Sequence, residues 1–146
     1  MWTVIRYKKK NLNILKSELL KKLGKNTIFY TPKIKVENSK KKEDLLLLGD
    51  YLLCFNKSFS NINIFRHLSN LKGLKYFLES YFSSQKDIKK FIDECKSFEN
   101  DEGYITQNFF NYEKNEKIKF LNGPFADMIF KIIDINRNKI KFLMGG

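Results

Sequence analysis

The most apolar stretch of the chain is Leu45-Leu46-Leu47-Leu48-Gly49-Asp50-Tyr51-Leu52-Leu53-Cys54-Phe55. It is shorter than the ~20 apolar residues that a membrane-spanning helix requires. Gly49 and Asp50 interrupt the run of large side chains, which favours an extended segment with a bend. We therefore predict a central, buried strand that bends at Gly49-Asp50, around which the domain is built.

In the segments before this stretch, the spacing of the apolar residues changes twice. Residues 2–7 are β-branched and aromatic, which predicts a strand. Leucines then recur at helical spacing as far as Gly24, a residue type that often ends helices: Leu12, Leu15, Leu19, Leu20 and Leu23. Residues 27–37 have an extended pattern, and Pro32 within them suggests an edge strand or a bend. The N-terminal third is thus predicted to be strand, helix, strand.

The segments after it continue the alternation. Residues 61–71 have a short helical pattern, and residues 74–78 have the composition of a strand. Ser84 and Asp87 then stand at the spacing of a capping box. The helix that they open has one apolar face, made of Ile88, Phe91, Ile92, Cys95 and Phe98. Alternating strands and helices of this kind predict an α+β domain.

The C-terminal part has a different pattern. The polar residues 99–103 suggest a linker, and apolar runs at residues 117–121, 128–135 and 140–144 suggest short strands separated by turns. These strands predict a small β unit. The chain is accordingly divided into a domain of residues 1–98, a linker of residues 99–112 and a β unit of residues 113–146.

The charge of the chain is high and uneven. The 28 basic and 16 acidic side chains give a formal net charge of +12. Residues 1–44 hold 13 cations and four anions, whereas residues 45–112 hold eight of each. Such a field favours a polyanion or an acidic protein surface as partner, and a solvated, solubilising face is the alternative interpretation. We also expect weak, sequence-independent contact with nucleic acid through Lys8, Lys9 and Lys10.

Few residues have the chemistry of a catalytic or metal site. Cys54 and Cys95 each lie within an apolar run, so we expect buried, reduced thiols and no disulfide framework. His67 is the only histidine, and no carboxylate or nucleophile accompanies it nearby in the sequence. We therefore expect no enzyme activity, metal or cofactor. The N-terminus lacks the pattern of a signal peptide, so we expect a cytoplasmic protein that makes no membrane contact.

The strongest local motif is Lys117-Ile118-Lys119-Phe120-Leu121-Asn122-Gly123-Pro124-Phe125-Ala126-Asp127, a basic strand that runs into a Gly-Pro-Phe turn. It resembles the start of the KOW unit of NusG-family transcription elongation factors. Four earlier segments resemble the family's strands in the same order: Trp2-Thr3-Val4-Ile5, Thr31-Pro32-Lys33-Ile34, residues 47–53 and residues 72–78. The chain departs from the family where Gly49-Asp50-Tyr51 replaces Pro-Gly-Tyr and where the last strand of the KOW unit is missing.

The resemblance implies a fold and a function. The fold would be an antiparallel sheet flanked by helices, followed by a small, incomplete KOW barrel. The function would be that of a transcription elongation or antitermination factor that binds the clamp helices of RNA polymerase and modulates pausing or termination. Ribosomal protein or termination factor would bind through the KOW unit. A KOW-containing protein that binds RNA or associates with the ribosome is the alternative, because it would share the β unit and the basic charge.

The resemblance also assigns candidate site residues. The clamp-binding positions are Arg6, Leu48, Tyr51 and Leu53, and the apolar members of this set have a role in the core as their alternative interpretation. The positions for a second polymerase contact, to the gate loop, are Ile64, Phe65 and Arg66. The turn of the KOW unit would consist of Gly123, Pro124 and Phe125.

Overall fold

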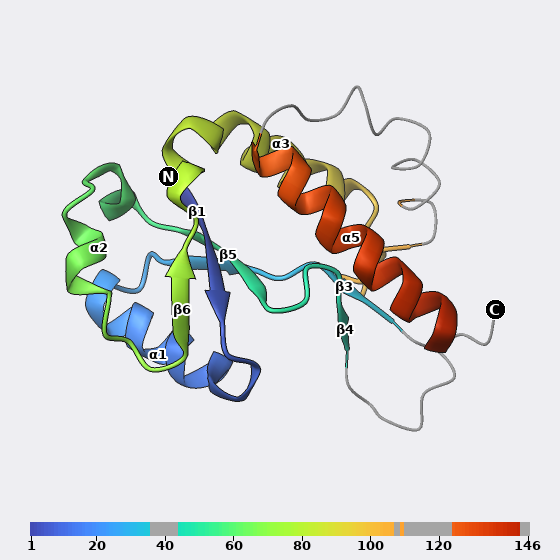
Figure 1. Cartoon of the computed structure of the whole chain (residues 1–146), viewed down its shortest axis with the longest axis horizontal. Helices are drawn as coiled ribbons and strands as arrows, with labels where there is room; N and C mark the ends of the chain where they lie inside the picture. Colours follow the sequence, from blue (N-terminus) through green and yellow to red (C-terminus); the bar gives the residue numbers. More distant parts are fainter. Residues whose placement is uncertain (36–43, 107–108, 110–123, 144–146) are drawn as a thin grey trace. The chain divides into compact units, whose positions relative to one another are not determined.

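The computed structural model describes residues 1–35, 44–106, 109 and 124–143 of the chain. These residues form an α+β structure with an antiparallel sheet and helices, as predicted (Figure 1). The chain forms two compact units. Unit 1 consists of residues 1–31 and 50–85, and unit 2 consists of residues 32–49 and 86–146. None of the boundaries falls in the predicted linker of residues 99–112.

Unit 1 is built on a four-stranded sheet with the order β2-β5-β1-β6. The two central strands are β1 (Trp2–Tyr7) and β5 (Tyr51–Phe55), and the edges are β2 (Ile28–Tyr30) and β6 (Leu74–Phe77). All neighbouring strands are antiparallel, and Figure 1 shows β1 and β6 side by side with opposite directions. The predicted strands at residues 2–7 and 74–78 are thus confirmed.

One face of this sheet forms the core of unit 1. Ile5 and Tyr7 of β1 and Leu52 and Cys54 of β5 are buried on this face and alternate with side chains of the opposite face, of which Val4 and Leu53 are also buried. They pack with α1 (Leu12–Leu23), and with side chains from the short helices η2 (Lys57–Ser60), α2 (Ile64–His67) and η3 (Glu79–Ser84). The buried members from outside the sheet are Leu15, Leu19, Phe59, Leu68, Leu71 and Tyr81. The predicted helix at residues 12–23 is confirmed, and it ends at Gly24, whose N–H donates to the Leu20 carbonyl at 2.9 Å.

The apolar stretch at residues 45–55 is not one bent strand. Leu45–Leu46 form β4, which pairs with β3 (Lys33–Ile34) in a separate two-stranded sheet. The chain then turns at Gly49, whose φ of +60° is accessible to glycine at low cost, and enters β5. The prediction of a bend is confirmed, and β5 is a central strand, but the two halves belong to different sheets and to different units.

Unit 2 contains the β3–β4 pair, most of α3 (Gln85–Ser97) and α5 (Pro124–Leu143). The predicted apolar face of α3 is confirmed, because Ile88, Phe91, Ile92 and Cys95 are all buried. Part of the predicted linker is an ordered turn. Glu99 and Ile105 form an isolated β-bridge, and the Ile105 N–H donates to the Lys33 carbonyl at 2.9 Å.

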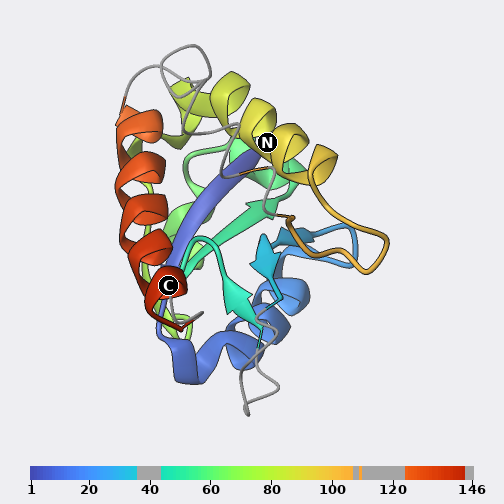
Figure 2. The same cartoon turned by 90° about the vertical axis from the view of Figure 1, so that its right-hand side faces the viewer.

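The predicted C-terminal strands at residues 128–135 and 140–144 are wrong, because α5 is one continuous helix through residue 143 (Figure 2). Its buried residues Phe125, Ile129 and Ile133 are four apart, which places them on one helical face. Pro124 occupies the first helical position, where a missing N–H costs nothing, and Asp127 lies in the first turn, where its negative charge interacts favourably with the helix dipole.

Two of the three strands predicted for the KOW unit, residues 128–135 and 140–144, are thus replaced by this helix. Phe125 does not lie in a turn between strands: it is buried in the first turn of α5, and its ring packs edge-on against Phe91 at 6.1 Å. Gly123 and the predicted strand at residues 117–121 lie outside the described residues. Within the part of the chain that is described, no helix is long and apolar enough to span a bilayer.

Candidate functional site

Three adjacent strands of unit 1 bring charged and aromatic side chains together. Side chains alternate along a strand, so Arg6 lies on the face of β1 opposite to Ile5 and Tyr7. The strand register pairs Arg6 with Tyr51 of β5 on one side and with Tyr76 of β6 on the other. Asp50 and Lys75 flank them. We refer to Arg6, Asp50, Tyr51, Lys75 and Tyr76 as the tyrosine–arginine cluster.

The contacts within the cluster centre on Arg6. Its guanidinium carbon lies 5.5 Å from the ring centre of Tyr51 and 5.9 Å from that of Tyr76, within the range of a cation–π interaction. Its Nε donates to Asp50 Oδ2 at 3.2 Å, and Lys75 Nζ lies 3.6 Å from the same oxygen. The two tyrosine hydroxyls are 3.1 Å apart. Tyr76 is 44% exposed, so a preassembled cluster is open to solvent.

The pKa shifts show how the cluster holds its protons. Burial, followed by the hydrogen bond to Tyr76, raises the pKa of Tyr51 to about 12. The same hydrogen bond lowers the pKa of Tyr76, because the Tyr51 hydroxyl can donate to the Tyr76 oxygen once that oxygen is ionised. Hydrogen bonds to Tyr76 and Asp50 raise the pKa of Arg6. The two hydroxyls share one hydrogen bond, which favours ionisation of Tyr76 over that of Tyr51.

The structure divides the four predicted clamp-binding residues. Arg6 and Tyr51 lie in contact at the surface of unit 1, whereas Leu53 is fully buried. Leu48 is also buried and belongs to unit 2. Burial matches the core interpretation of the two leucines, and the role of all four in polymerase binding stays a prediction. The sequence reasoning missed Tyr76. Its strand was predicted, but the register that places Tyr76 beside Arg6 was not.

The three predicted gate-loop residues lie on α2 and differ in exposure. The Phe65 ring stacks on Phe59 at 5.5 Å and meets Tyr81 edge-on at 4.9 Å, so it belongs to the core of unit 1. Ile64 is partly buried against the same core, and Arg66 is exposed. The exposed apolar residue of this region is Ile62, at 75% exposure, which the sequence reasoning did not single out.

The predicted nucleic-acid contacts Lys8, Lys9 and Lys10 are all exposed. The Lys8 N–H donates to the Gly73 carbonyl at 2.8 Å, which holds the turn before β6 against the lysine run. Gly73 has a φ of +92°, and a Cβ atom there would lie 2.6 Å from Asn11 Cβ. This close approach requires glycine and brings the exposed Lys72 to the same part of unit 1.

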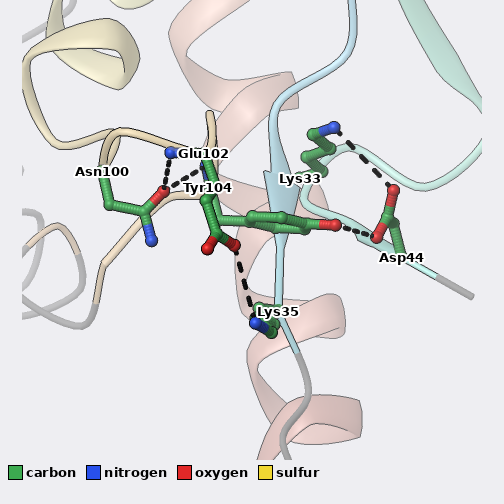
Figure 3. Close-up of polar contacts among 6 residues, drawn as sticks. All are labelled: Lys33, Lys35, Asp44, Asn100, Glu102 and Tyr104. Atoms are coloured by element: carbon green, nitrogen blue, oxygen red, sulfur yellow. Dashed lines mark hydrogen bonds and ion pairs between the residues drawn. The ribbon is translucent and has the colours of Figure 1, made fainter. Parts of the chain in front are cut away.

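A second polar cluster lies in unit 2, shown in Figure 3. The Tyr104 hydroxyl donates to Asp44 Oδ1 at 2.6 Å, and Lys33 Nζ lies 4.8 Å from the Tyr104 ring centre and 3.9 Å from Asp44 Oδ2. Lys35 and Glu102 form an ion pair at 3.5 Å. Each cation here has its own carboxylate. We therefore interpret this cluster as a structural contact that holds the turn at residues 100–104 against the β3–β4 pair.

The residues considered for catalysis are not assembled into a site in the described part of the chain. Cys54 and Cys95 are buried free thiols, as predicted, and burial raises the pKa of Cys54 to about 12. A thiol with so high a pKa is a poor nucleophile. His67 is exposed on α2. No group of three or more His, Cys, Asp or Glu side chains among the described residues is placed to hold a metal ion.

The tyrosine–arginine cluster is thus the candidate site: it is exposed, preassembled and richer in hydrogen-bond donors than in acceptors. It can bind a partner but contains no nucleophile or base poised for chemistry. No protein-family model matches the sequence, and no curated protein matches it significantly.

Proposed function

We propose that this chain is a transcription elongation or antitermination factor that binds the clamp helices of RNA polymerase through the tyrosine–arginine cluster. The observation that carries the proposal is the contact between Arg6 and Tyr51, which are 45 positions apart and were both assigned to clamp binding. Their neighbour Tyr76 extends the surface. Tyrosine and arginine are the residue types that dominate the binding energy of protein interfaces.

The cluster is suited to binding without rearrangement. β1, β5 and β6 hold its side chains in register, and the Tyr7 N–H fixes the backbone of Asp50 by donating to its carbonyl at 3.0 Å. A surface that is ordered before binding loses little conformational entropy when a partner docks. Binding energy from this surface is therefore available to favour one state of the polymerase over another.

The proposed mechanism needs no covalent chemistry. A factor that binds the elongating conformation of the polymerase more tightly than the paused one shifts the population towards elongation. Arg66, exposed on α2, is the member of the predicted gate-loop set that is accessible for a second contact. The proposal includes no ribosomal protein or termination factor, because these partners depended on the C-terminal strands that α5 replaces.

The test is capture of RNA polymerase from a native lysate by the tagged full-length chain. We expect polymerase subunits in excess of ribosomal proteins, and a loss of about 30-fold in affinity for a Tyr51→Ala/Tyr76→Ala variant, as for truncation of a binding hot spot worth about 2 kcal/mol. Phe82→Ala is the matched control, since Phe82 is a 59% exposed aromatic residue of η3 in the same unit. Capture of ribosomal proteins alone, or equal capture by both variants, would contradict the proposal.

A further inference from the structure

We propose that the tyrosine–arginine cluster recognises a carboxylate on its partner, so that the docking segment is an acidic one that carries Glu or Asp. This inference deepens the proposed function, and rests on it for the identity of the partner. The reasons lie in the donors of Arg6, the charge of unit 1 and the position of Asp50.

Arg6 has donors to spare. An arginine side chain carries five N–H groups; the bond to Asp50 uses the one at Nε and a hydrogen bond to Tyr76 uses another, which leaves three. The terminal nitrogens of the guanidinium therefore lie outside this ion pair. Two N–H groups on one edge of a guanidinium match the two oxygens of a carboxylate, which makes arginine a specific receptor for that group. The Tyr51 and Tyr76 hydroxyls bond to each other, so the pair leaves one O–H that can donate to a ligand beside it.

The cluster has more positive than negative charges. Arg6 and Lys75 both pair with the same Oδ2 atom of Asp50, so two cations share one anion. The whole of unit 1 has 12 basic and only three acidic side chains, and all its residues are described. Of the other two acidic residues, Glu18 pairs with Lys21 on α1. A partner carboxylate would restore the charge balance at a site that already binds one.

A nucleic acid fits this site less well. Single strands bind by stacking bases on exposed aromatic faces. Here the Arg6 guanidinium lies over one face of each tyrosine ring, where it competes with a stacking base. The exposed lysines that suit phosphates, Lys8 to Lys10, follow β1 and are not part of the cluster.

The experiment titrates the isotope-labelled full-length chain with two helical peptides of about 15 to 20 residues, one with Glu at paired i, i+4 positions and one with Gln there. NMR signals of the Arg6 Nε–H and the Tyr51 and Tyr76 rings report binding. We expect the Glu peptide to shift all three and the Gln peptide to shift none. Equal shifts with both peptides would overturn the inference, as would shifts caused only by a single-stranded oligonucleotide.

Variants sharpen this test. Arg6→Gln should weaken Glu-peptide binding at least tenfold. Asp50→Asn keeps an acceptor for Arg6 Nε but removes a like charge, and should tighten binding several-fold. Lys57→Gln, an exposed lysine of η2, is the control and should change nothing. The site is not specific for a carboxylate if Asp50→Asn does not bind the Glu peptide more tightly. The same conclusion follows if Lys57→Gln loses as much affinity for that peptide as Arg6→Gln.

The peptide titration and the polymerase capture can fail separately. If the Glu peptide binds at Arg6 but no polymerase is captured, the carboxylate site stands and the proposed function falls. If polymerase is captured but the Glu peptide leaves the Arg6 signal unmoved, the proposed function stands and the carboxylate inference falls.

Discussion

Unit 1 and unit 2 differ more in charge than in size. Unit 1 has 12 basic and three acidic side chains, whereas unit 2 has 16 basic and 13 acidic ones. In unit 2 the cations Lys33 and Lys35 each pair with a carboxylate (Figure 3). In unit 1 most cations have no carboxylate available. Lysine-rich composition alone thus says little about partners, because most of the excess of cations lies in unit 1.

The two units also differ in how they bury apolar surface. Unit 1 packs one face of a four-stranded sheet against short helices, and Phe59 lies fully buried among Phe65, Phe77 and Tyr81. In unit 2, α3 and α5 meet through the rings of Phe91 and Phe125. Pairs of substitutions, one at a buried and one at an exposed position, can test the packing of each unit.

The largest effect is expected at the core of unit 1. Phe59→Ala should lower the free energy of unfolding by about 3 to 5 kcal/mol, because it leaves a cavity beneath the sheet. Phe82→Ala, at a 59% exposed position of the same unit, should cost less than about 1 kcal/mol. Urea denaturation measures both. Equal losses would show that burial does not distinguish these two positions.

The next effect tests whether the C-terminal segment is a helix. Ile133 is buried in α5 and Ile135 is 59% exposed, although in a strand both would lie on one face. Ile133→Ala should cost about 2 to 4 kcal/mol in urea denaturation, and Ile135→Ala close to nothing. Similar losses at both positions would favour the strand that the sequence pattern predicts there.

Alkaline pH should weaken unit 1 through Tyr7. Burial raises the pKa of this phenol to about 12, so the folded state holds its proton more tightly than the unfolded state, whose pKa is near 10. The stabilisation is fully present below pH 10 and is lost as the pH rises towards 12, by about 2 to 3 kcal/mol. Urea denaturation at several pH values measures it. Tyr7→Phe should show a shallower decline, and an unchanged decline would rule out Tyr7 as its source.

A smaller effect concerns the turn that supports the lysine run. Gly73→Ala should cost about 1 to 3 kcal/mol, because the added Cβ meets Asn11 and φ is positive. Gly24→Ala is the control, since Gly24 has a similar φ of +98° but nothing within 4 Å of an added Cβ. Thermal unfolding compares the two. If Gly24→Ala were as costly as Gly73→Ala, the positive φ alone would explain both.

The smallest effect compares the charges of the two units directly. Binding of duplex DNA should be weak at physiological salt, and Lys8→Gln/Lys9→Gln should reduce the salt dependence of log Kd by about 0.9 for each phosphate that the variant no longer neutralises. Lys86→Gln/Lys89→Gln, at exposed positions of α3, should leave that slope unchanged. Fluorescence anisotropy at several salt concentrations measures the slopes. A larger change of slope in the α3 variant would show that the lysines of α3, and not Lys8 and Lys9, contact the DNA.

Much of unit 1 and α3 could be predicted from the sequence alone. The β-branched and aromatic composition of residues 2–7, the leucine spacing of residues 12–23 and the apolar face of residues 85–97 predicted these elements, and all three have the predicted type. Such periods are local, because they record which side of an isolated element avoids water. The burial of Cys54 and Cys95 was predictable for the same reason.

Only the tertiary structure decided the rest. Residues 128–135 are apolar at six of eight positions, so their pattern fits both the two-residue period of a strand and the 3.6-residue period of a helix. The segment is a helix in the structure, and Phe125 at its start packs against Phe91. The tyrosine–arginine cluster depends on strand register between residues up to 70 positions apart, from Arg6 to Tyr76. Register arises from the pairing of distant strands over a shared core, and no local pattern in β1, β5 or β6 encodes which side chains become neighbours.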